Sequence, residues 1–214
     1  MIFALLGLFF LIYYLLFGWR KEILEAEKKS GFLSLSKIGH MLPTGVFIQP
    51  SFTWGKILET GNLMVGIQPI LMGLVGKADE IELPEKSARV KKGDILFKIK
   101  KGEKVLKLKS PVSGEITAVN SLLLDESDWQ NLSQNWIFTI KPENMGLEIG
   151  NWLFAEQSKD WINKTFQQIK NFLTLSLPQT QVGITMADGG DIPVGILSQF
   201  DEKTWSSFEE KFIV

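Results

Sequence analysis

The chain has 214 residues, of which 45% are hydrophobic and 22% are charged, and its formal net charge is −1. This length provides for one ordinary hydrophobic core with some additional elements. The nearly balanced charge argues against a nucleic-acid partner bound through bulk electrostatics. Because the chain contains no cysteine, disulfides, thiolate metal sites, iron–sulfur clusters and thiol nucleophiles are all excluded.

The first eighteen residues contain no charged side chain. As a helix they span about 27 Å, close to the ~30 Å hydrocarbon thickness of a bilayer. Arg20 and Lys21 follow at once, and basic residues on this flank favour an N-terminus outside and a body in the cytoplasm. A cleaved signal peptide instead has its basic residues before the apolar run. The sequence predicts a single-pass membrane anchor over residues 1–19, with a buried core helix as the alternative.

Residues 20–50 are predicted to form a stalk and a linker. Residues 20–29, with the sequence RKEILEAEKK, have high helix propensity, and Gly31 ends this helix. Glycines and prolines from there to residue 50 indicate loop. His40 lies in this loop and is the one histidine of the chain. A single histidine forms no metal cluster, and a general base needs an orienting partner, so we interpret His40 as an incidental loop residue.

Residues 51–142 predict a β-rich domain. Short runs of alternating apolar and polar residues, separated by turns, predict strands at residues 54–59, 63–67, 80–83, 95–100, 104–109, 114–119 and 136–140. Residues 68–75 predict a short helical turn between them. Many short strands at regular spacing are typical of a barrel or sandwich, so the predicted fold class is mainly β.

The most informative part of this domain is a predicted hairpin over residues 95–109. Two runs in which apolar residues alternate with lysines meet at the tip Lys101-Gly102-Glu103. Gly102 supplies the positive φ that a tight turn requires. Lysines crowd between Lys86 and Lys109. A solvated sheet face is the simpler interpretation of this run, and a docking surface for an acidic partner is the alternative.

After residue 142 the hydrophobic period changes. In the segment 143–177, apolar residues from Leu153 to Leu173 recur at helical spacing and predict an amphipathic helix. This helix packs against the β domain or, in the alternative interpretation, lies on the membrane surface. The C-terminal extension, residues 178–214, contains a turn at residues 188–191 that lacks the ligand spacing of a calcium loop. A short helix over residues 201–212, capped by Asp201, follows.

An ordered series of motifs over residues 52–142 carries a resemblance to a known family. The motifs are FTW at 52–54, LMVGI at 63–67, GKADEIELP at 76–84, VKKGD at 90–94, SPVSGE at 110–115, VN at 119–120, and a tryptophan followed by IKP within 136–142. In this order they resemble the glycine cleavage system H protein family. The resemblance implies a lipoyl-type domain, a barrel-sandwich hybrid whose hairpin lysine carries lipoate, and a non-catalytic carrier subunit of an enzyme complex.

The chain departs from this family at the hairpin tip. The family's E-S-V-K motif ends in the carrier lysine, and the same columns here read KKGE, residues 100–103. Counts from Gly93 and back from Ser110 both place Glu103 at the carrier position. A carboxylate cannot accept lipoate, because the amide bond needs a primary amine. Lys104, one position on, is the alternative attachment residue, although a one-residue slip turns a strand side chain to the opposite face.

The resemblance and its departures favour one function and leave two alternatives. The favoured hypothesis is a membrane-tethered H-protein-like module without a cofactor, which is an adaptor or structural subunit with a protein partner and not an enzyme. The first alternative is a genuine lipoyl carrier of a glycine cleavage-like system that uses Lys104. The second is a periplasmic secretion adaptor, whose half-motifs usually flank a long helical hairpin instead of a tight turn. The expected fold is mainly β, a lipoyl-like barrel-sandwich hybrid with an N-terminal transmembrane helix and C-terminal helices.

Overall fold

The computed structural model describes residues 35–120, 136–176 and 192–213. The predicted anchor at residues 1–19, the stalk helix at 20–29 and the turn at 188–191 lie outside these residues. None of the helices within the described ranges is long and apolar enough to cross a membrane. The chain from Ser34 to Val214 forms a compact unit of its own.

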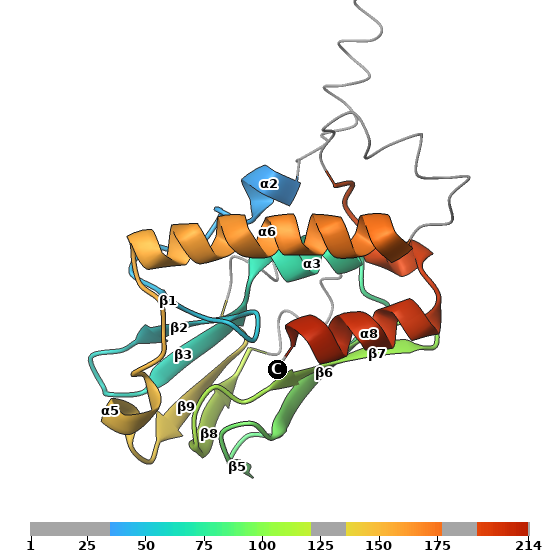
Figure 1. Cartoon of the computed structure of the whole chain (residues 1–214). Helices are drawn as coiled ribbons and strands as arrows, with labels where there is room; N and C mark the ends of the chain where they lie inside the picture. Colours follow the sequence, from blue (N-terminus) through green and yellow to red (C-terminus); the bar gives the residue numbers. More distant parts are fainter. Residues whose placement is uncertain (1–34, 121–135, 177–191, 214) are drawn as a thin grey trace, which may run out of the picture. The chain divides into compact units, whose positions relative to one another are not determined.

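A six-stranded antiparallel sheet forms one part of this unit (Figure 1). Its strand order is β1-β2-β3-β9-β8-β5. The strands are β1 (Phe47–Gln49), β2 (Thr53–Ile57), β3 (Leu63–Ile67), β9 (Phe138–Pro142), β8 (Gly114–Val119) and β5 (Arg89–Val90). The strands predicted near residues 54, 63, 114 and 136 are confirmed, with bounds shifted by up to two residues. The sequence did not predict β1 and β5, because three and two residues are too few to show a period of two.

A three-stranded antiparallel sheet contains the predicted hairpin. It consists of β4 (Glu80–Glu82), β6 (Ile95–Lys101) and β7 (Lys104–Lys109), in the order β4-β6-β7, so that β7 is an end strand. Lys101 pairs with Lys104, and Gly102 has φ +59°, as the tight turn requires. A register shift between Ile95 and Phe97 departs from the predicted alternation. It leaves Ile95 53% exposed.

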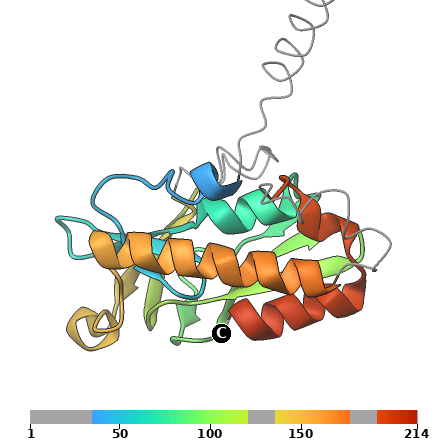
Figure 2. The ribbon, with the colours of Figure 1, turned by 45° about the horizontal axis from the view of Figure 1, so that its top comes forward.

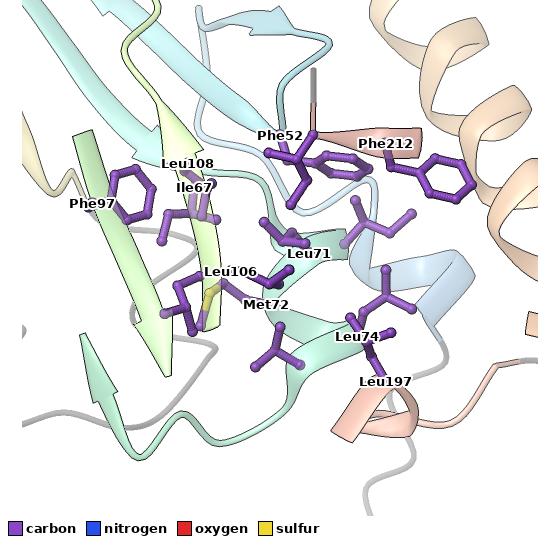
Figure 3. Packing of buried hydrophobic residues seen from close by; sticks show 14 of the residues in the cluster. Phe52, Ile67, Leu71, Met72, Leu74, Phe97, Leu106, Leu108, Leu197 and Phe212 are labelled. Carbon is purple, nitrogen blue, oxygen red and sulfur yellow. The ribbon is translucent and has the colours of Figure 1, made fainter. Parts of the chain in front are cut away.

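The two sheets pack together through one hydrophobic core. Leu106 and Leu108 of β7 are fully buried, whereas Lys107 between them is exposed, as the alternation predicts. Across the core, the ring of Phe97 on β6 lies 6.0 Å from that of Phe138 on β9, measured between centroids. Figure 3 shows Leu106 against Met72, and Met72 belongs to helix α3 (Pro69–Val75), which follows β3. The structure therefore confirms the mainly β, sandwich-like part of the predicted fold.

Helices α3, α6 and α8 pack against the hydrophobic core. Helix α3 (Pro69–Val75) begins with Pro69, which needs no hydrogen-bond acceptor at a helix start, and all seven of its residues are buried. Helix α6 (Glu156–Ser176) buries a stripe of five side chains, namely Ser158, Ile162, Thr165, Ile169 and Leu173. Their helical spacing confirms that the predicted amphipathic helix packs against the domain. Figure 2 shows α3 and α8 on either side of α6. The short helix α2 (Leu35–Ile38) contacts α3, whereas the short helix α5 (Met145–Glu148) follows β9 at the far end of the unit (Figure 1).

Residues 192–213, which we call the C-terminal cap, belong to the same core. They form the 3₁₀ helix η2 (Ile196–Gln199) and helix α8 (Glu202–Phe212). The carboxylate of Asp201 accepts a hydrogen bond from the backbone N–H of Thr204 at 2.8 Å, which confirms the predicted N-cap. On α8, Phe208 is fully buried and lies in ring contact with Phe52 and Phe172.

The cap is attached to α3 and to the hairpin. The backbone N–H of Gly195 donates to the carbonyl of Gly73 at 2.8 Å. A Cβ on Gly76 would lie 2.8 Å from the Cα of Gly195, so these two backbones need glycine for their close approach. Helix α8 packs beside β7 (Figure 1). The C-terminal extension thus completes the domain on the side of the hairpin.

Candidate functional site at the hairpin tip

The tip of the hairpin is fixed by a carboxylate that precedes β4. Asp79 accepts hydrogen bonds from Lys101 Nζ at 2.8 Å and from the backbone N–H of Gly102 at 2.7 Å. These two bonds hold the pKa of Asp79 below its usual value. Glu103, which the sequence comparison with the resembling family predicts at the carrier position, is exposed in the turn. A carboxylate therefore stands at the accessible end of a rigid hairpin.

Ion pairs between β4 and β6 neutralise part of the lysine run. Lys98 Nζ lies 2.8 Å from a carboxylate oxygen of Glu82, and Lys100 pairs with both Glu80 and Glu82. Hydrogen bonds from Lys100 and then Lys98 lower the pKa of Glu82 to about 2. Both β4 carboxylates therefore pair with lysines of β6. This arrangement supports the solvated sheet face over a docking surface for an acidic partner, because three of the lysines are already paired.

Lys104, the alternative attachment residue, points to the C-terminal cap. Its ammonium donates to the backbone carbonyls of Ser198 at 2.7 Å and Phe200 at 2.5 Å. The same nitrogen lies 5.5 Å from the ring centre of Trp205, within cation–π range. Lys104 is half-buried. The amine nearest to the carrier position is therefore used to hold the cap on the hairpin.

A groove of about 500 Å³ runs between the hairpin and α8. It is lined by side chains of both charges: Lys98, Lys100, Lys104, Lys107, Glu103, Glu202, Glu209 and Glu210. A groove with this mixture does not select an anion or a cation by charge alone. Nowhere in the described part of the chain do three histidine or carboxylate side chains gather in a way that would hold a metal ion.

A buried polar cluster connects the start of β2 to the start of α3. Gln68 Nε2 donates to the backbone carbonyls of Gln49 at 3.0 Å and Thr53 at 3.2 Å. The hydroxyls of Ser51 and Thr53 both donate to the Gln49 side chain, at 3.2 and 3.1 Å. Phe52 lies between them with φ +61°, a conformation that non-glycine residues rarely adopt. The cluster was not predictable from the sequence, because its uncharged residues carry no catalytic or metal-binding signature.

Two packed β sheets, a tight lysine-rich hairpin and C-terminal helices are the mainly β arrangement that the resemblance to a lipoyl-type domain predicts. The sequence model of the glycine cleavage H-protein family matches residues 47–165, which is more than half of the chain. The chain belongs to the glycine cleavage H-protein family, whose role is that of a non-catalytic lipoyl carrier subunit. The C-terminal cap lies beyond the matched residues.

Two sequence relatives support this assignment. The chain is 34% identical to a probable glycine cleavage system H protein of Thermococcus gammatolerans, over 52% of this chain and 85% of the relative. It is 30% identical to the glycine cleavage system H protein of Methylococcus capsulatus, over 54% of this chain and 91% of the relative. A crystal structure of the H protein from Mycobacterium marinum aligns with a TM-score of 0.47 and 20% identity, covering 57% of this chain and 98% of that one.

Proposed function

We propose that this protein is a membrane-tethered H-protein-like module that carries no lipoate and acts as an adaptor or structural subunit of a larger complex. The observation that carries this proposal is the pair of residues at the tip. Glu103 at the carrier position offers no amine, and the Lys104 ammonium is bound to two carbonyls of the cap. Acylation requires a deprotonated amine that is free to attack. Neither residue meets this requirement in the described arrangement.

The adaptor role is supported by the rigidity of the exposed tip. Asp79 holds the turn on one side, and the cap holds Lys104 on the other. A surface that is already ordered loses little conformational entropy when a partner binds. The exposed Gly102 and Glu103 are the residues that such a partner would meet first. The near-neutral charge of the chain favours a protein partner over nucleic acid.

The membrane tether is supported by the uncharged N-terminal run. Its first eighteen residues match the hydrocarbon thickness, and Arg20 and Lys21 follow them. We propose that this segment anchors the protein with its body in the cytoplasm. Carbonate extraction of membranes tests the tether: the full chain should stay in the pellet, and a variant without residues 1–19 should be released. Recovery of the full chain in the supernatant would contradict the tether.

The carrier alternative, with lipoate on Lys104, requires the cap to detach first. Intact-mass measurement of the protein purified from its native membranes in mild detergent separates the two functions. The proposed function predicts the unmodified mass, whereas a lipoyl adduct that disappears in Lys104→Arg and persists in Lys107→Arg would establish the carrier. Glu103→Lys is the matched positive variant, because it restores an exposed amine at the family's carrier position. Mass spectrometry of co-purified proteins then identifies the partner.

A further inference from the structure

A second pocket, of about 310 Å³, lies at the start of helix α6, and none of its lining residues belongs to the hairpin or the cap. Apolar side chains form its walls: Leu42, Pro43, Val46, Phe154, Ala155 and Ile162. Val46 and Ile162 are buried, whereas Phe154 is 50% exposed at the surface. The pocket thus joins the loop before β1 to the beginning of α6 and offers an apolar interior with an open side.

Three polar side chains, each able to donate a hydrogen bond, also line this pocket. The side chain of Ser158 lines the pocket and is only 7% exposed, and within the described residues its Oγ has no hydrogen-bond partner. A buried hydroxyl without a partner favours a ligand that bonds to it. Lys159 and His40 also line the pocket and are exposed.

Lys159 is available to an anion despite its present contact. Its Nζ lies 2.7 Å from Glu156 Oε1, but the two side chains are 61% and 80% exposed. Exposed pairs of this kind contribute little and exchange readily. The N-terminal end of the 21-residue helix α6 adds a positive partial charge at the same place. The polar side of the pocket therefore suits a negatively charged group.

We infer that this pocket binds a medium-chain monocarboxylate, with the alkyl chain between the apolar walls and the carboxylate at Ser158 and Lys159. At the roughly 30 Å³ that one water occupies in the liquid, 310 Å³ accommodates about ten non-hydrogen atoms. Octanoate, with two carboxylate oxygens and eight carbons, is of about this size. A neutral amphiphile of the same length bonds to Ser158 but makes no use of the positive charge of Lys159.

Calorimetric titration of residues 34–214 with simple carboxylates tests the inference. This unit is suitable because its core is formed by residues between Leu35 and Ile213. Octanoate should bind about 15-fold more tightly than hexanoate, the equivalent of about 0.8 kcal/mol for each of two buried methylenes. Octanoate should also bind at least about 5-fold more tightly than octanol, which lacks the charge. Equal affinities in either comparison would overturn the inference.

Three variants locate the binding. Leu42→Trp fills the pocket and should weaken octanoate binding at least about tenfold. Leu147→Trp makes the same change at a leucine that is 81% exposed and does not line the pocket, so it should bind octanoate normally. Ser158→Ala should weaken binding about 5-fold through the lost hydrogen bond. If Leu42→Trp folds and binds octanoate as tightly as the unsubstituted protein, the inference is overturned. If Leu42→Trp does not fold, unchanged octanoate affinity of Ser158→Ala overturns it.

Discussion

Replacing Lys104 with methionine tests how the C-terminal cap is held on the hairpin. Methionine keeps the apolar stem and removes the ammonium that binds the carbonyls of Ser198 and Phe200 and faces the Trp205 ring. Hydrogen bonds to a charged group contribute about 1.5–3 kcal/mol, and an exposed cation–π contact about 0.5–1 kcal/mol. Because the bonds share one ammonium, we expect the free energy of cap docking to fall by about 2–3 kcal/mol. The population with an open cap should then rise roughly 30- to 150-fold.

Amide hydrogen exchange of α8 measures this opening directly, because exchange from a locally opened segment reports its free energy. Lys107→Met is the matched control, since Lys107 lies three positions along the same strand and is exposed. We expect faster exchange of the α8 amides in Lys104→Met and no change in Lys107→Met. If the α8 amides exchange at the same rate in both variants, the Lys104 ammonium does not hold the cap on the hairpin.

Three further predictions concern the stability of the domain. Two β6 lysines lower the pKa of Glu82 from 4.5 to about 2, so the ionised carboxylate stabilises the fold above pH 4.5 and this stabilisation is lost as the pH falls toward 2. The Glu82→Gln variant should therefore show a smaller fall of Tm between pH 4.5 and 2. A Tm profile that is unchanged in this variant would contradict the ion pairing. In Gly66→Ala the new Cβ would lie 2.1 Å from the ring of Trp54 on the neighbouring strand, so the free energy of unfolding measured in urea should fall by about 1–3 kcal/mol or more. In the control Gly150→Ala, where a Cβ meets nothing within 4 Å, the free energy of unfolding should change little. Phe208→Ala should lower the free energy of unfolding by about 3–5 kcal/mol, because Phe208 is fully buried. Leu147→Ala is the control, since Leu147 is exposed. If Phe208→Ala lost no more stability than this control, the cap would not be part of the core.

Local patterns made much of the fold predictable. The hairpin follows from its period of two and from Gly102, and the packed face of α6 follows from its period of 3.6. Where a pattern was too short or was interrupted, the prediction fell short. Strands β1 and β5 contain too few residues to show a period, and the register shift at Ile95 exposes a side chain that alternation places inside. These features depend on pairing with distant strands rather than on the local sequence.

The tip residues were predictable from the sequence, but their contacts were not. Counting from two turns predicted that Glu103 occupies the carrier position, and this assignment stays a prediction. The partners of Lys104 are backbone carbonyls that lie 94 and 96 positions further along the chain. Backbone atoms have the same chemistry at every residue, so no sequence motif marks them. The membrane anchor over residues 1–19 stays a prediction.

The position of the cap beside β7 also affects how copies of this protein meet one another. An end strand presents N–H and C=O groups that can pair with a strand from another chain, and natural proteins often cover such an edge with a helix. Here α8 takes that place beside β7. A chain cut before residue 192 would therefore offer a new site for strand addition. We therefore expect the C-terminal cap to hinder self-association through this edge as well as to hold Lys104.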